Sequence, residues 1–203
     1  MYLIIDFEAT CWADDSNREH SAKKDNEIIE IGSALVDDQF QLVDRHSIYV
    51  RPVRNPILSD FCKQLTSIKQ EDVDNAKLFP EALKDFLLHI ESKLDGGKKM
   101  EDLLFCSWGH YDKNQLKKDC DYNKVPYPFK LHISLKHEFA NRHKFKAMGT
   151  VSALNYLGLQ FEGVNHRGLD DAYNIARIFI REWKPTGLQV SKQHIIRWSD
   201  YAK

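Results

Sequence analysis

The stretch YLIIDFEAT, residues Tyr2–Thr10, decides how the rest of the chain is interpreted. Apolar residues run directly into Asp6, and Glu8 follows two positions later. Side chains at positions i and i+2 of a strand point to the same face, so the two carboxylates are expected to project together. Their like charges repel, and such a pair needs a cation, a shared proton or open water. The plain alternative is a strand that ends in solvent at Asp6.

The composition describes an ordinary chain of one domain. Its 203 residues, of which 42% are apolar and 29% charged, are enough to bury a substantial core. The first apolar run is too short for a signal peptide or a membrane span, which predicts a cytoplasmic protein with no membrane partner. The four cysteines are dispersed and are expected to be reduced thiols. The net charge of −1 gives no overall attraction to nucleic acid, so a ligand of that kind requires a local patch.

The pattern of apolar residues predicts an α/β or α+β arrangement, with a central mixed sheet of five strands flanked by helices. A domain core is expected over about 1–185, followed by a C-terminal tail over 186–203. The expected strands cover 2–7, 28–38, 40–50, 103–108 and 130–135. Helices are expected over 60–66 with Ser59 as N-cap, after Pro80, and near 112–120, 136–143, 150–157 and 169–183.

Further acidic and basic side chains stand where strands end and helices begin. Asp112 follows the strand over 103–108, where a carboxylate can also be a simple charge at a helix N-terminus. His166 precedes the last helix, and a histidine in such a place is by itself more often a hydrogen-bonded loop residue than a catalyst. In the first turn of that helix, Asp171 falls near the core-facing side, where a charge needs a partner. Asp170 is expected to be a solvated capping charge.

Two acidic residues in the run NEIIEIG are expected to lie outside any site. Glu27 and Glu30 are interpreted as solvated charges near the end of a strand.

The acid and base positions form a recognisable ordered set. A D-x-E pair on the first strand precedes an aspartate after the fourth strand and an H-x-x-x-x-D motif at the last helix. The set resembles that of the DEDDh exonucleases over nearly the whole chain, and its members are Asp6, Glu8, Asp112, His166 and Asp171. The stretches FEAT, EIIEIG, FCKQLT, WGHYD and HRGLDDAYNIARI are most similar to the RNA-trimming branch. That branch comprises the enhancer-of-RNA-interference and histone-mRNA 3′-end exonucleases and bacterial sporulation-inhibitor-type relatives.

The resemblance implies an RNase H-like fold and 3′-to-5′ hydrolysis of single-stranded nucleic acid, with RNA favoured and DNA as the alternative. It also implies two divalent cations, Mg²⁺ or Mn²⁺, which prefer carboxylate oxygen and water and act together in phosphodiester hydrolysis. In the family pattern, Asp6 bridges both cations and Asp112 supports the second. Glu8 and Asp171 hold the first. His166 is then the general base, a role suited to an imidazole.

Several residues are candidates for holding the substrate. By resemblance, Phe61 and Tyr111 sandwich the terminal base, and stacking of this kind is worth roughly 1–3 kcal/mol per base. Phe61 is equally explained as a core residue of its short helix. Ala9, Thr10 and Cys11 follow the acidic pair and are expected to contact the terminal sugar, where a 2′-hydroxyl distinguishes RNA from DNA.

A basic segment between two of the motifs is a candidate phosphate-binding patch. It reads KHEFANRHKFKAMG and interleaves aromatic residues with cations, among them Lys144. The other cationic members are Lys136, Arg142, His143 and Lys146, and the aromatic ones are Phe139 and Phe145. A solvated helix face is the alternative.

Two other protein classes share features with this sequence. The stretch LIIDFEAT resembles the D-x-D-x-T strand of haloacid dehalogenase-type phosphatases. In that class the second acid is an aspartate, whereas Glu8 is one methylene longer, and an H-x-x-x-x-D motif has no role. A non-catalytic RNA-binding module on the same scaffold would not need all five acid and base residues, and all five are intact.

Overall fold

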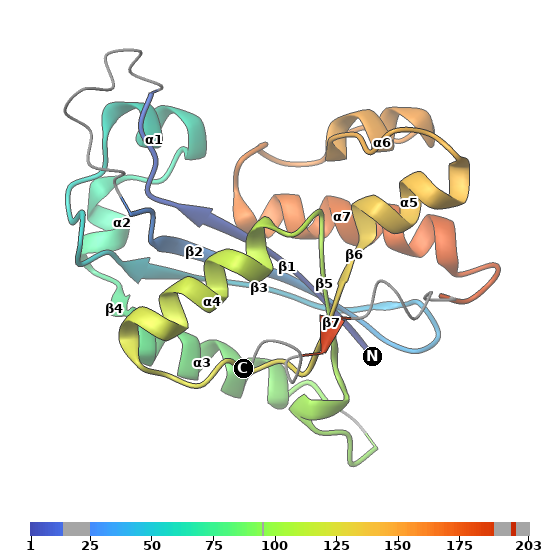
Figure 1. Cartoon of the computed structure of the whole chain (residues 1–203), viewed down its shortest axis with the longest axis horizontal. Helices are drawn as coiled ribbons and strands as arrows, with labels where there is room; N and C mark the ends of the chain where they lie inside the picture. Colours follow the sequence, from blue (N-terminus) through green and yellow to red (C-terminus); the bar gives the residue numbers. More distant parts are fainter. Residues whose placement is uncertain (14–24, 95, 189–195, 198–203) are drawn as a thin grey trace.

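The computed structural model describes residues 1–13, 25–94, 96–188 and 196–197. A mixed sheet runs through the molecule with helices on both of its faces (Figure 1). Its strands are β1 (Tyr2–Ala9), β2 (Ile28–Val36), β3 (Leu42–Arg51), β4 (Lys77–Leu78), β5 (Leu104–Ser107), β6 (Leu131–Ser134) and β7 (Ile196–Arg197). The helices are α1 (Asp60–Thr66), α2 (Gln70–Asp74), α3 (Phe79–Glu91), the 3₁₀ turn η1 (Met100–Asp102), α4 (Tyr111–Asn123), α5 (Leu135–His143), α6 (Thr150–Tyr156) and α7 (Gly168–Trp183).

The strand order is β4-β3-β2-β1-β5-β6-β7. The first three strands pair antiparallel, β1 pairs parallel with β5, and β5 pairs parallel with β6. The mixed sheet and its five longer strands are confirmed. The expected number of strands is wrong, because β4 and β7, of two residues each, extend the two edges. β7 comes from the expected C-terminal tail, most of which lies outside the described residues.

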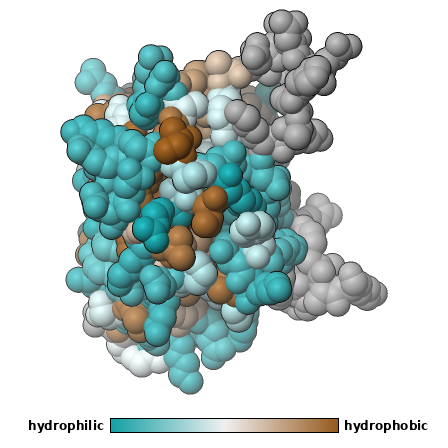
Figure 2. Space-filling view, turned by 90° about the vertical axis from the view of Figure 1, so that its left-hand side faces the viewer, coloured by the Kyte–Doolittle hydropathy of each residue, from teal (hydrophilic) through white to brown (hydrophobic). Residues whose placement is uncertain are grey.

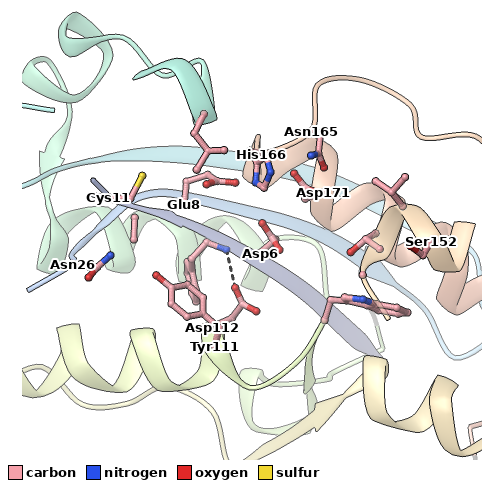
Figure 3. A pocket seen from close by; sticks show the side chains of 17 residues that line it. Asp6, Glu8, Cys11, Asn26, Tyr111, Asp112, Ser152, Asn165, His166 and Asp171 are labelled. Atoms are coloured by element: carbon pink, nitrogen blue, oxygen red, sulfur yellow. Dashed lines mark hydrogen bonds between the residues drawn. The ribbon is translucent and has the colours of Figure 1, made fainter. Parts of the chain in front are cut away.

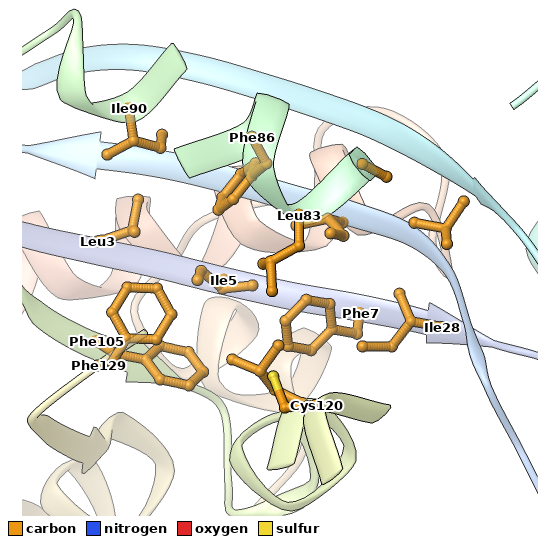
Figure 4. Packing of buried hydrophobic residues seen from close by; sticks show 14 of the residues in the cluster. Leu3, Ile5, Phe7, Ile28, Leu83, Phe86, Ile90, Phe105, Cys120 and Phe129 are labelled. Atoms are coloured by element: carbon orange, nitrogen blue, oxygen red, sulfur yellow. The ribbon is translucent and has the colours of Figure 1, made fainter. Parts of the chain in front are cut away.

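One face of the sheet packs on α3 and α4 (Figures 1 and 4). The odd-numbered residues of β1 point to this face, because side chains alternate along a strand. Leu3, Ile5 and Phe7 are buried there, and Leu83 and Phe86 of α3 pack in the same cluster. This face of the sheet is therefore covered by a hydrophobic core.

The opposite face packs on α5, α6 and α7. Even-numbered residues of β1 point this way, and Ile4 is fully buried against a cluster that includes Ile175 and Phe179 of α7. Because Asp6 and Glu8 continue the same alternation, they face the side of the sheet that α7 covers. The expected projection of both carboxylates from one face is confirmed by the strand itself.

Local sequence signals explain where several elements begin and end. Ser59 caps α1 as expected, with its hydroxyl accepting the Cys62 N–H at 3.0 Å. Pro80 occupies the first turn of α3, where a missing N–H costs nothing. Among the described residues, no helix has the length and apolar character that crossing a bilayer requires.

The interpretation of Asp170 as a solvated capping charge is wrong. Its carboxylate accepts the Val164 N–H at 2.8 Å and lies 3.4 Å from the Arg45 guanidinium. It therefore fixes the loop that leads into α7.

Candidate active site

The paired carboxylates of β1 stand where this strand runs past the beginning of α7. Gly168 opens α7 and packs directly on β1 and β2. A Cβ on Gly168 would come within 2.9 Å of the Asp6 carbonyl oxygen, so only glycine allows this approach. Asp171 lies in the first turn of the helix and is thereby brought over the strand that carries Asp6 and Glu8.

Three carboxylates meet at this place. Asp6, Glu8 and Asp171 each offer an oxygen atom, and these atoms all lie within 4.8 Å of one another. Figure 3 shows the three side chains turned toward the same space, with His166 beside them. The cluster predicted from positions far apart in the sequence is therefore assembled by the fold.

Asp112 approaches the same space from the other side of β1. It is buried in the first turn of α4, and its Oδ1 accepts the Phe7 N–H at 3.1 Å (Figure 3). The bond ties the start of α4 to the strand between the two acidic residues. Asp112 is not a member of the group whose oxygens lie within 4.8 Å, but it lines the same cleft.

The electrostatics of the cluster favour neutralisation of its charge. Burial, with the Asp112 and Asp171 carboxylates next in order, raises the pKa of Asp6 well above its ordinary value. Burial and the neighbouring carboxylates of Asp171 and Glu30 raise the pKa of Glu8 to about 8. Burial likewise raises the pKa values of Asp112 and Asp171 to about 6, against hydrogen bonds from backbone N–H groups. Burial and mutual repulsion thus disfavour the ionised forms of all four carboxylates, and Glu8 retains its proton near neutral pH unless positive charge compensates it.

His166 has an unusual backbone conformation at the mouth of this cluster. Its φ of 63° lies in the left-handed region, which is uncommon for a residue with a side chain. The side chain is exposed and lines the cleft. The loop places an imidazole beside Glu8 and Asp171, as Figure 3 shows.

A cleft of about 480 Å³ surrounds these groups. Its lining contains all five acid and base residues of the predicted set. The sequence did not single out the other walls, which are supplied by Asn26, Leu65, Trp108, Gly149, Thr150, Val151, Ser152 and Asn165. A signal existed for Trp108 and Leu65, since they stand in the stretches WGHYD and FCKQLT that carry the resemblance.

The expected nucleic-acid contacts are distributed unequally. Ala9, Cys11 and Tyr111 line the cleft, and the Tyr111 side chain is 52% exposed. Phe61 is 40% exposed on α1. That helix lies at the end of the molecule that Figure 2 faces, where hydrophobic residues lie between hydrophilic ones. Thr10 is buried away from the cleft lining, and its hydroxyl accepts the Glu27 N–H.

The cationic residues of the basic segment lie outside the lining of the cleft. Lys144 is exposed at the C-terminus of α5. Arg142 and His143 are both paired with Glu182 of α7, and Phe139 is fully buried in the core. Phe139 is therefore a packing residue. A phosphate-binding role for Lys144 stays a prediction.

The interpretation of Glu27 and Glu30 as solvated charges is wrong. Glu27 is buried and accepts the N–H groups of Val53 and Asn55. Glu30 is fully buried on β2, directly opposite Glu8, and pairs with Arg167. Glu30 therefore lies beside the acidic cluster and not outside the site.

The donor set fits hard divalent cations. Carboxylate oxygens are the ligands that Mg²⁺ and Mn²⁺ prefer, and the raised pKa values of Asp6 and Glu8 show that the cluster is short of positive charge. Binding of these cations does not require neutral nitrogen or sulfur ligands. The four cysteines are free thiols, as expected.

Comparison with known proteins agrees with this geometry. A family model described as "Exonuclease" matches residues 3–179. The human protein named 3′-5′ exoribonuclease 1 is 36% identical over 184 residues, covering 88% of this chain and 51% of its own length. The fission yeast 3′-5′ exonuclease eri1 is 32% identical, covering 87% of this chain and 65% of its own length. The chain thus spans about half the length of the mammalian relatives it matches.

Solved structures show the same architecture. The nuclease domain of 3′hExo, a DEDDh family member bound to rAMP, superposes with a TM-score of 0.82 at 31% identity. That match covers 94% of this chain and 96% of the other. A structure described as a 3′-exonuclease recognising the 3′ end of a histone mRNA stem-loop superposes with a TM-score of 0.80 at 30% identity, covering 97% of this chain and 69% of that one. The fold is RNase H-like, as predicted.

Proposed function

Because this chain belongs to the exonuclease family, we propose that it is a 3′-to-5′ exonuclease acting on single-stranded nucleic acid with a free 3′ end. The observation that carries the proposal is the group of three carboxylates within 4.8 Å, with Asp112 and His166 lining the same cleft. RNA is the favoured substrate, since the relatives named above are exoribonucleases and one solved relative binds rAMP. The cytoplasmic location stays a prediction.

The cofactor that we propose is a pair of divalent cations, Mg²⁺ or Mn²⁺. Asp6, Glu8 and Asp171 would hold the first cation, and Asp112 would hold the second together with Asp6. When bound, such cations supply Lewis-acid activation of water and stabilisation of the leaving oxygen. The protein holds Asp112 in place through the Phe7 N–H and Asp171 through the Arg167 N–H at 3.1 Å.

His166 is proposed to accept the proton of the attacking water. It stands at the mouth of the cleft and beside the carboxylates, and the hard cations do not need an imidazole ligand. Replacing His166 by alanine should lower kcat by about 10²–10⁴-fold, the usual contribution of a general base. Calorimetric titration with Mn²⁺ should still show the parent's number of sites. Loss of a cation site, or a parent-like kcat, would assign His166 another role.

The terminal nucleotide is proposed to lie across Tyr111. Its exposed ring stands directly beside Asp112 (Figure 3), so a base stacked on it would bring the terminal phosphodiester toward the acids. Phe61 is proposed as the second stacking ring. Ala9 and Cys11 line the cleft next to Glu8 and are proposed to contact the sugar.

The deciding experiment uses RNA and DNA oligonucleotides of one sequence, labelled at the 5′ end. We expect a ladder that shortens from the 3′ end with Mg²⁺ or Mn²⁺, no cleavage in excess EDTA, and faster shortening of RNA. Cleavage that begins internally, or full activity in EDTA, would refute the proposal. Faster shortening of DNA would favour the DNA-directed alternative. Release of inorganic phosphate alone would indicate a phosphatase, and RNA binding without shortening a binding module.

A further inference from the structure

Glu30 is a buried carboxylate that the catalytic set does not include. It lies opposite Glu8 in the pairing of β1 with β2, and opposite Tyr49 in the pairing of β2 with β3. Directly opposed residues of an antiparallel pair share a face, so the three side chains form a row across the sheet. Glu30 is 0% exposed, and a buried charge of this kind needs a partner.

The partners of Glu30 come from the turn that carries His166. Glu30 Oε2 accepts the Gly168 N–H at 3.0 Å and lies 3.3 Å from Arg167 Nε. The other oxygen, Oε1, is buried and has no hydrogen-bond partner within the described part of the chain. The Arg167 guanidinium also donates to the Tyr49 hydroxyl. One side chain thus holds the two residues that follow His166.

The turn at His166 needs such support. A residue with a side chain is disfavoured at φ of 63°, and this conformation persists where its surroundings fix it. On the side toward α7, the Arg167 N–H donates to Asp171 at 3.1 Å, and the Arg167 carbonyl accepts the Asp171 N–H at 2.8 Å. Together with the bonds to Glu30, these contacts fix both peptide groups after His166.

From this arrangement we propose that Glu30 is a positioning residue for the reaction. It acts through Arg167 and Gly168, and it sets where the His166 imidazole stands relative to the cleft. Glu30 itself contacts neither the substrate nor the reacting atoms. The proposal rests on the proposed exonuclease function and deepens it, since it assigns a role to a residue outside the five-residue set.

The charge of Glu30 is the part of the contact that carries the role. A glutamine would have nearly the same size, and its carbonyl oxygen could still accept the Gly168 N–H. It would lose the ion pair with Arg167. The Arg167 side chain is 27% exposed, so its guanidinium could then turn toward solvent. Glu30→Gln therefore tests the ion pair while it leaves the volume of the core unchanged.

Glu27 offers a matched control on the same segment. It is also a buried carboxylate, it accepts two backbone N–H groups, and it lies 3.6 Å from Arg54. Its partners belong to the segment that follows β3 and not to the turn at His166. Glu27→Gln should thus carry a comparable cost in stability without moving the imidazole.

The measurements are kcat and KM on 5′-labelled single-stranded RNA, the pH–rate profile, thermal unfolding, and calorimetric titration with Mn²⁺. Glu30→Gln should lower kcat by about 10–10²-fold, because a misplacement near 1 Å can cost that much. KM should change less than about threefold, since the ring of Tyr111 is untouched. The pH–rate profile of Glu30→Gln should lose the acidic limb that a general-base imidazole produces, and His166→Ala should lose the same limb. Glu27→Gln should keep the parent's kcat and profile.

Three results would overturn the proposal. Glu30→Gln could keep the parent's kcat and pH profile at a lowered melting temperature, which would make Glu30 purely structural. It could lose a Mn²⁺ site, which would make its free Oε1 a metal ligand. Should Glu30→Gln fail to fold, Arg167→Gln decides, because glutamine removes the positive charge that pairs with Glu30. A parent-like kcat in a folded Arg167→Gln protein would then refute the proposal. If the parent protein itself shortens no RNA or DNA, the proposed function fails instead.

Discussion

The substitution Gly32→Ala should separate α7 from the sheet and thereby disable the candidate site. Gly32 lies opposite Asp6 in the pairing of β1 with β2. A Cβ at this position would come 1.9 Å from the Gly168 carbonyl carbon, 2.2 Å from its oxygen and 2.3 Å from the Leu169 nitrogen. All three are backbone atoms, so no side-chain rotation can relieve the clash.

The size of the effect follows from these distances. Non-bonded carbon atoms approach to about 3.5 Å, so the first turn of α7 must withdraw by roughly 1.6 Å from its 1.9 Å contact. Overpacking of this kind costs about 1–3 kcal/mol. Weakening the bond from the Gly168 N–H to the charged Glu30 adds about 1.5–3 kcal/mol. Together these terms amount to about 2.5–6 kcal/mol, which lowers the melting temperature of a chain of this length by roughly 5–24 °C.

The effect on activity should exceed the effect on stability. The same displacement moves Asp171 and His166 away from Asp6 and Glu8, and a misplacement near 1 Å can cost about 10²-fold in rate. The assay compares thermal unfolding and the kcat of RNA shortening at a temperature where both proteins are folded. Gly149→Ala is the stability control, because its φ is −69° and a Cβ there meets nothing within 4 Å. An unchanged melting temperature and kcat in Gly32→Ala would refute the close packing of α7 on β2.

Three further predictions concern the carboxylates and the stacking ring. Asp6→Asn should abolish RNA shortening in a folded protein, because it removes the carboxylate expected to be shared by both cations; normal turnover would remove Asp6 from the site. Tyr111→Ala should weaken binding of the terminal nucleotide by about 1–3 kcal/mol without changing Mn²⁺ affinity, and parent-like RNA affinity and activity would make the ring structural. In EDTA, the melting temperature should fall as pH rises from about 5 to 8, because the pKa of Glu8 is raised from 4.5 to about 8. In this range the folded protein holds a proton that the unfolded protein has lost, so the free energy of unfolding falls by about 1.4 kcal/mol per pH unit. Added Mg²⁺ should oppose the fall. A pH-independent melting temperature in EDTA would contradict this prediction.

The acid and base positions could be predicted because each stands in a local pattern. Asp6 and Glu8 share the period of a strand, and Asp171 shares the period of the helix that begins at Gly168. Asp112 stands at the N-terminus of α4, where acidic residues are favoured. These patterns involve only residues that are near one another in the sequence, so they can be recognised without knowledge of the fold.

Glu30 could not be assigned in this way. It interrupts a strand whose residues are all buried, and nothing within that strand indicates what compensates its charge. Its partner Arg167 lies 137 positions away. The same limit applies to the wall that Val151 and Ser152 supply from α6, since tertiary packing alone brings that helix to the cleft. The two-residue strands β4 and β7 are too short to show a period.

The start of α7 is the feature that turns one face of β1 from core into site. Ile4 faces α7 and is fully buried beneath it. Two residues later, the Asp6 carbonyl lies under Gly168, and the Glu8 carboxylate has an oxygen within 4.8 Å of one of Asp171. The side chains of β1 keep alternating between the two faces along this stretch. The even-numbered residues change from apolar to acidic where α7 begins. A glycine on each side, Gly32 and Gly168, brings that boundary close enough for Asp171 to join the strand's carboxylates. The chemistry of the cleft is therefore set by where one helix begins.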